Sequence, residues 1–378
     1  MQTPSSRRDL RLDFFRGLAL WFIFIDHVPS SIVGNITFRN FGFSDATEIF
    51  VFISGYTAAI VYGASLRRNG FAHMLFQVLK RCWQLYAAHI LLFVFFIAQI
   101  TWVSIRFDNA SFSEELNVMA FHERPQESII GALILRYRPV NLDVLPLYMA
   151  LLAGFPLCLW LMARSRRLTL FASVVLWACV QLYQWAVPVY ANGETWLFNP
   201  LGWQVLFVIG ALCGSARNED IPWLRWRPWL GGAAALWLVF ALVVTISWKY
   251  PPLNDWVEPA VAPWLYPIDK GNLGIARLLH FLAVAYLVVR LVPENTPALN
   301  WPLAEPVIRC GQHSLYIFCL SISLSFVAHF VLVQFGRGIM MQLAVIVGGF
   351  VLMSAVAYLL HWLDRSGRSA PAPAHASR

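Results

Sequence analysis

The sequence predicts an all-α, polytopic transmembrane helix bundle with about ten spans, and three observations support this fold class. Of the 378 residues, 59% are hydrophobic and only 13% are charged, which is roughly half the charged fraction of a soluble domain. The mean hydropathy is +0.60, and apolar runs long enough to cross the hydrocarbon core separate the charged stretches. Seventeen Trp and twenty-eight Phe suit aromatic belts at the two membrane interfaces.

The apolar runs define the expected spans. They lie near residues 14–30, 46–63, 83–103, 144–163, 168–187, 196–214, 230–248, 273–292, 314–335 and 338–362. We therefore expect residues 1–365 to form one transmembrane domain. Residues 366–378 are rich in Pro, Ala and Ser and predict a disordered cytoplasmic tail.

The basic residues fall unevenly on the two sides of these spans. The side that holds both termini has an excess of Lys and Arg of about two to one, mostly in short loops. The positive-inside rule makes that side cytoplasmic, and we expect a multi-pass protein of the bacterial inner membrane, in contact with the lipid bilayer. The net charge of +8 then reflects topology, and no nucleic-acid partner is expected.

The six cysteines lie in or beside spans and form no CxxC pair. They are typical of small apolar core residues and do not indicate a disulfide framework or a metal site. We expect no metal and no bound cofactor.

Ionisable residues inside spans are costly, so they are the best pointers to function. Arg16 and His27 are eleven positions apart, which places them on one face of the first span about 16 Å apart along its axis. Asp13 lies near the same face. Asp45 and Glu48 open the next span as an i,i+3 pair after a short loop, so we expect them close to His27. A histidine beside carboxylates has the composition of a general base with an orienting acid.

Further polar residues are expected at both membrane surfaces. Arg277 and His280 form another i,i+3 pair in the external half of a late span, which suggests a polar cavity that opens outward. The long external segment 104–143 adds the arginines Arg136 and Arg138. On the cytoplasmic side a basic pocket suits the phosphates of a nucleotide-bearing donor. Its members are Arg11, Asp13, Arg16 and Arg81.

Structural interpretations compete with these functional ones. Arg16 is also compatible with a side chain that reaches the lipid headgroups, and His27 with a satisfied packing histidine. Nearby Asp13 favours a paired role for Arg16, and nearby carboxylates favour a chemical role for His27. His280 is open to either interpretation.

At these residues the chain resembles the membrane acyltransferases of the acyltransferase-3 type. The matching segments are RLDFFRGLA at 11–19, FVFISGY at 50–56, KRCWQLY at 80–86 and GQHSLY at 311–316. Longer strings resemble the OpgC family of osmoregulated periplasmic glucan succinyltransferases. They are RLDFFRGLALWFIFIDH, FGFSDATEIFVFISGYTAA, NLDVLPLYMALL, NPLGWQVLFVIGAL and GQHSLYIFCLSIS, in this order along nearly the whole chain. One departure is Ala87 after Tyr86, where acyltransferase-3 enzymes often have Pro.

The resemblance implies an acyl-CoA-dependent O-succinyltransferase. Succinyl-CoA would bind from the cytoplasm as co-substrate, and the acceptor would be glucose units of a periplasmic glucan. His27 takes the position of the essential first-helix histidine. Arg11, Asp13 and Arg16 match the first-helix charged motif, and Arg81 matches the third-helix arginine.

We expect His27, held by Asp45 or Glu48, either to deprotonate a glucan hydroxyl or to accept the acyl group itself. The sequence leaves both routes open. The substrate or the acyl group would contact residues of the external half, with an arginine holding the succinyl carboxylate. The candidates are Arg277, His280, Arg136 and Arg138.

Rival functions follow from the same residues. An O-acetyltransferase acting on another polysaccharide or lipid would need no cation for its acyl end. A proton-coupled transporter would use His27, Asp45, Glu48 and His280 as a relay, and a non-catalytic scaffold is a third reading. The basic cytoplasmic pocket favours the enzyme, because a proton relay gives no reason for it. A homo-oligomer and contact with a glucan synthase are left open.

Overall fold

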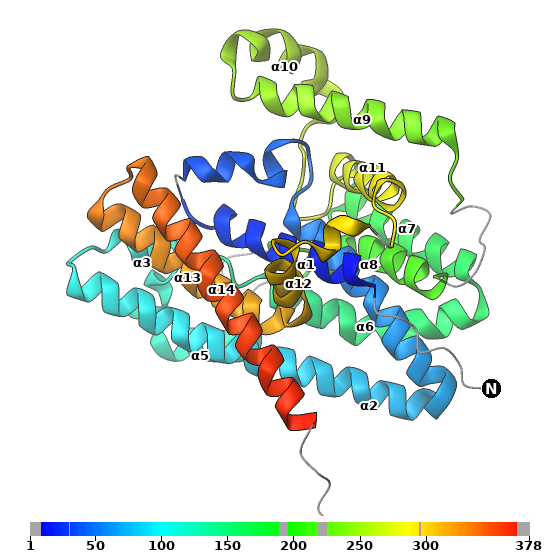
Figure 1. Cartoon of the computed structure of the whole chain (residues 1–378), viewed down its shortest axis with the longest axis horizontal. Coiled ribbons are helices and arrows are strands. Elements are labelled where there is room, and N and C mark those ends of the chain that lie inside the picture. Colours follow the sequence, from blue (N-terminus) through cyan, green and yellow to red (C-terminus); the bar gives the residue numbers. More distant parts are fainter. Residues whose placement is uncertain (1–8, 30, 189–195, 218–224, 295, 369–378) are drawn as a thin grey trace, which may run out of the picture. The chain divides into compact units, whose positions relative to one another are not determined.

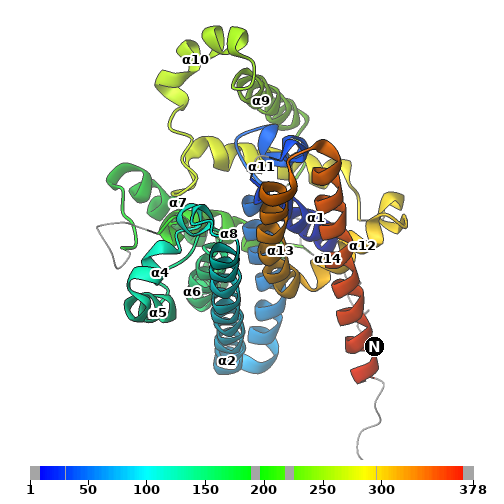
Figure 2. The same cartoon turned by 90° about the vertical axis from the view of Figure 1, so that its left-hand side faces the viewer.

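A computed structural model describes residues 9–29, 31–188, 196–217, 225–294 and 296–368 (Figures 1 and 2). Its elements are α-helices and short 3-10 helices, which confirms the all-α class. The chain divides into two compact units, one made of Met1–Gly34 with Val292–Arg378 and the other of Asn35–Leu291. The predicted tail beyond Arg368 lies outside the described residues.

The first unit contains α1 (Leu10–Asp26), α12 (Ala304–Gln312), α13 (Ser314–Phe335) and α14 (Ile339–Arg368). Helix α1 begins after Asp9, whose side chain accepts a hydrogen bond from the backbone N–H of Arg11. Two glycines bring α1 and α12 into backbone contact. A Cβ on Gly17 would overlap the carbonyl oxygen of Val307, and one on Gly311 would overlap that of Asp13. Small residues at such a crossing are typical of packed membrane helices.

The second unit is built around α2 (Ala46–Arg106), which contains two of the predicted spans, 46–63 and 83–103. The connection between them is helical except at Gly70, where φ is 81° and ψ is 176°. This conformation is accessible to glycine and breaks the helical hydrogen bonding. Helix α2 consequently bends sharply back at this point (Figure 1).

Helix α8 (Pro200–Ser215) crosses the first arm of α2 at a second glycine contact. A Cβ on Gly55 would overlap the carbonyl oxygen of Phe207, and one on Gly210 would overlap that of Phe52. The two backbones therefore pack without intervening side chains, which fixes the arm that carries the start of α2.

The segment 104–143 was expected as an external extramembrane stretch, and it folds into α3 (Ser111–Glu115), α4 (Met119–Glu123) and α5 (Pro125–Leu133). These helices return along the second arm of α2. Tyr86 donates a hydrogen bond to the carbonyl oxygen of Leu133 at 2.8 Å, and the hydroxyls of Ser104 and Ser113 lie 2.9 Å apart.

The remaining helices of this unit are α6 (Val144–Arg164), α7 (Arg166–Tyr183), α9 (Pro228–Ser247), α10 (Pro251–Leu265) and α11 (Ile275–Leu291). In the described part of the chain, five helices are long and apolar enough to cross a membrane. They are α2, α6, α9, α13 and α14, and α8 is a shorter apolar helix. The transmembrane class is thus supported. The count of ten spans is not confirmed, partly because α2 joins two of them and partly because α1 and α11 have only 17 residues each.

Candidate functional site

A cluster of charged side chains occupies the start of α2 in the second unit. Arg277 of α11 donates from Nε to Oε1 of Glu48 at 2.8 Å and from Nη2 to Oδ2 of Asp45 at 3.0 Å. The side chains of all three residues are at most 11% exposed. One guanidinium therefore bridges Asp45 and Glu48, the two carboxylates predicted to take part in catalysis.

A fourth charge joins this cluster, and no pattern in the sequence points to it. Lys270 Nζ lies 2.6 Å from Oδ2 of Asp45, and its side chain is 44% exposed. Lys270 and Asp45 are 225 positions apart in the sequence, and this separation gives no signal of the contact. We define Asp45, Glu48, Lys270 and Arg277 as the charge cluster.

Each oxygen of the two carboxylates accepts at least one hydrogen bond or ion-pair contact. Asp45 Oδ1 accepts from the backbone N–H of Thr47 at 2.8 Å, and Glu48 Oε2 accepts from that of Asp45 at 2.9 Å. This reciprocal capping box begins α2. Burial on its own would raise the pKa of Asp45, but Lys270 and Arg277 hold that pKa well below its usual range. Asp45 is therefore an ionised anchor for cations.

His280 binds the segment just before Asp45. Its Nδ1 lies 2.7 Å from the hydroxyl of Ser44, and both side chains are buried. Gly42 leaves room for the imidazole, because a Cβ at that position would overlap the ring. Helix α11 thus holds the segment 42–48 at two points, through His280 and through Arg277.

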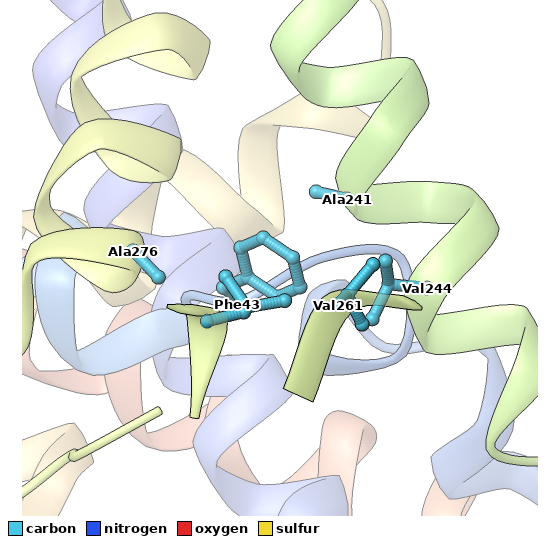
Figure 3. Packing of buried hydrophobic residues seen from close by; sticks show 6 residues of the cluster. Phe43, Ala241, Val244, Val261 and Ala276 are labelled. Carbon is cyan, nitrogen blue, oxygen red and sulfur yellow. The ribbon is translucent and has the colours of Figure 1, made fainter. Parts of the chain in front are cut away.

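Apolar packing fixes the same segment from another direction. Phe43 is buried in a cluster with Ala241 and Val244 of α9, Val261 of α10 and Ala276 of α11 (Figure 3). This apolar cluster holds Phe43 between three helices. Asp45, the first residue of the charge cluster, follows Phe43 by two positions. The position of Asp45 and Glu48 in the fold is therefore set by the hydrophobic core of this unit.

His27 lies in the first unit, at the C-terminal end of α1. Its Nδ1 is 2.6 Å from the carbonyl oxygen of Ile23. A carbonyl oxygen only accepts, so Nδ1 carries the proton and a neutral imidazole has its lone pair on Nε2. With Nδ1 donating to Ile23, Nε2 is the nitrogen of this half-buried histidine that can accept a proton. Asp45 and Glu48 belong to the other unit, so their contact with His27 stays a prediction.

The expected donor-binding residues are divided between the units. Arg11 binds Asp9 and donates to the carbonyl oxygen of Val292 at 2.8 Å. Asp13 is buried, and Arg16 is half-buried. Arg81 belongs to the second unit, where it is half-buried and donates to Gln84 at 3.2 Å. Their assembly into one pocket stays a prediction.

The two arginines of the segment 104–143 differ. Arg136 is exposed. Arg138 is committed to the protein, because its Nε donates to Asp143 at 2.8 Å and its guanidinium lies 4.6 Å from the ring centroid of Trp196. Neither observation tests binding of an acyl group.

The family model described as OpgC protein matches residues 8–365. The matched region includes His27, the charge cluster and both glycine crossings. Comparisons with curated proteins and with solved structures gave no match.

Proposed function

Because the chain belongs to the OpgC family, we propose that it transfers a succinyl group from cytoplasmic succinyl-CoA to glucose hydroxyls of periplasmic glucans. Membership indicates a transferase with a role in periplasmic glucan modification. The observation that carries the proposal is the match over nearly the entire chain. The succinyl donor, the inner membrane and the cytoplasmic position of the termini are part of the proposal.

His27 is the proposed reacting base. Its Nδ1 contact with Ile23 leaves the lone pair on Nε2. In direct transfer, Nε2 removes the proton of a sugar hydroxyl while the sugar oxygen attacks the thioester carbonyl and the thiolate of coenzyme A leaves. In the alternative route Nε2 itself attacks the thioester carbonyl and the thiolate of coenzyme A leaves. The sugar oxygen then takes the acyl group from Nε2, and the hydroxyl proton goes to the thiolate or to water. Nε2 is the reacting atom in both routes.

The donor would be held by the basic side chains that the sequence places on the cytoplasmic side. Arg11, Arg16 and Arg81 are the proposed partners of the phosphates of coenzyme A, with Asp13 as a neighbouring acceptor. Arg11 already bridges Asp9 and Val292, so phosphate binding would share or replace these contacts.

Mass spectrometry of periplasmic glucans tests the proposal. Cells that lack the gene are complemented with wild type, His27→Ala or His73→Ala at equal protein abundance. His73 is an exposed histidine bonded to Gln77 and serves as the matched control. We expect succinyl-sized additions with wild type and His73→Ala and none with His27→Ala.

Three outcomes would contradict parts of the proposal. Unchanged glucans in the deletion strain would exclude this acceptor and leave other acyl acceptors or transport. Additions of acetyl size would retain acyl transfer and exclude the succinyl donor. Full activity of His27→Ala would remove His27 from the chemistry.

A further inference from the structure

We propose that Lys270 is the residue that recognises the carboxylate at the distal end of the transferred acyl group. The inference rests on the proposed function and replaces the expectation that Arg277 holds this carboxylate. It follows from how the two cations of the charge cluster are bound.

Arg277 is not available for exchange. Its side chain is 10% exposed and contacts Asp45 at 3.0 Å and Glu48 at 2.7 Å. Moving its guanidinium to a ligand would leave two buried carboxylates without their shared cation, which is strongly unfavourable. Arg277 is therefore a fixed part of the structure.

Lys270 differs from Arg277 in how exposed its side chain is and in which contacts remain when that side chain moves away. Its side chain is 44% exposed, against 11% for its partner Asp45. When the ammonium group leaves Asp45, the carboxylate keeps its contacts with Arg277 and with the backbone N–H of Thr47. The exchange of Lys270 from Asp45 to a ligand carboxylate leaves both buried carboxylates in contact with Arg277, and it swaps one charge-assisted hydrogen bond for another.

The backbone around Lys270 is held rigidly. Trp203 Nε1 donates to the carbonyl oxygens of Lys270 and Gly271 at 3.1 Å and 3.0 Å. Gln181 donates to that of Asn272 at 2.8 Å, and Trp177 to that of Leu273 at 2.9 Å. Four consecutive carbonyl groups thus bind α7 and α8.

This loop gives the lysine a fixed origin. Its backbone is positioned by Trp203, which is fully buried, while its flexible four-carbon side chain is 44% exposed and can turn from Asp45 to a ligand. Fixing the support of a binding group lowers the entropic cost of forming its contact. A neutral acyl group has no carboxylate to receive the ammonium, so the exchange selects an acyl group derived from a dicarboxylic acid.

Donor competition provides the first test. The full chain in nanodiscs, with glucan acceptor, receives equal concentrations of succinyl-CoA and butyryl-CoA, which have acyl chains of equal length. We expect Lys270→Gln to lower the ratio of kcat/KM for succinyl-CoA over butyryl-CoA by about tenfold to a hundredfold, the loss typical of one charge-assisted contact. Lys270→Arg should keep most of this preference.

Lys249→Gln is the matched control. Lys249 is also expected in the external loops, but its Nζ binds the neutral side chains of Asn35 and Asn40 at 3.0 Å and 2.7 Å. We expect its selectivity ratio to equal that of wild type. An unchanged ratio in Lys270→Gln would overturn the proposal.

A binding measurement separates this inference from the proposed function. Free succinamate, which carries one carboxylate as the succinyl group does, and the uncharged diamide succinamide are added to the purified chain at equal ionic strength, and thermal unfolding is followed. We expect succinamate to raise the Tm of wild type more than succinamide does, and this difference to disappear in Lys270→Gln. If the difference is absent in wild type, or equal in both proteins, the proposal is wrong. A Lys270-dependent difference without any transfer to glucan would retain the anion site and refute the proposed function.

Discussion

Both units pair an arginine with carboxylates, and the two arrangements differ in burial. In the second unit Arg277 joins Asp45 and Glu48, with side chains at most 11% exposed. In the first unit Arg309 of α12 pairs with Glu305 at 3.1 Å, with side chains 24% and 51% exposed. Water and ions screen the exposed pair and barely reach the buried one. Burial, more than pairing, decides what each arginine contributes.

The largest expected effect is the loss of the buried arginine. Arg277→Gln removes the cation shared by Asp45 and Glu48 while both carboxylates remain buried, so we expect a loss on the order of 3–5 kcal/mol in the free energy of unfolding. Thermal or denaturant unfolding of the purified protein in detergent measures it. Adding Asp45→Asn and Glu48→Gln to Arg277→Gln should recover part of the loss. If Arg277→Gln changed the free energy of unfolding as little as the loss of an exposed ion pair does, burial would not explain the difference between the two arginines.

Substitutions at the two glycine crossings should lower the free energy of unfolding by an intermediate amount that is similar in both units. Gly210→Ala in α8 and Gly17→Ala in α1 each place a methyl group against a backbone carbonyl, which cannot rotate away. We expect each substitution to cost about 1–3 kcal/mol, as overpacking does. Gly232→Ala is the control, because a Cβ there has nothing within 4 Å.

The glycine comparison has a clear contrary outcome. Gly232→Ala lies within α9 and should leave stability unchanged or slightly higher, because alanine favours helix over glycine. If all three variants unfolded at the same temperature, the two crossings would not be in close backbone contact. A loss confined to one unit would show that the crossings differ in how far their helices can separate.

The smallest effect is expected for the exposed pair. Arg309→Gln removes the contact with Glu305, and we expect a change of about 0–1 kcal/mol that shrinks further as salt is added. The same unfolding assay at low and high ionic strength measures it. A loss approaching that of Arg277→Gln would show that Arg309 matters through its other partners, such as His361, whose Nε2 lies 2.8 Å from Nη1 of Arg309.

Several features of the site could be predicted from the sequence because they are local. The spacing of Asp45 and Glu48 predicts that both face one side of a helix start, and the structure adds that they form its capping box. Arg277 and His280 are spaced to contact one neighbouring segment, and both bind residues 44–48. The chemical roles assigned to these residues stay predictions.

Other features have no local signal. Asp45 and Arg277 are 232 positions apart, and Lys270 is indistinguishable in sequence from the other basic residues of the expected external loops. The return of the segment 104–143 along α2 depends on single contacts such as that of Tyr86 with Leu133. The sequence predicts no span between residues 63 and 83, whereas the structure shows that this stretch is helical except at Gly70.

The sequence by itself determined the membrane class, the helical composition and the family resemblance, because hydropathy, spacing and ordered motifs are properties of neighbouring residues. The tertiary structure decided which charges neutralise one another. Arg277 became a buried anchor and Lys270 an exposed, exchangeable cation because packing of α7, α8 and α11 sets how much water each side chain meets.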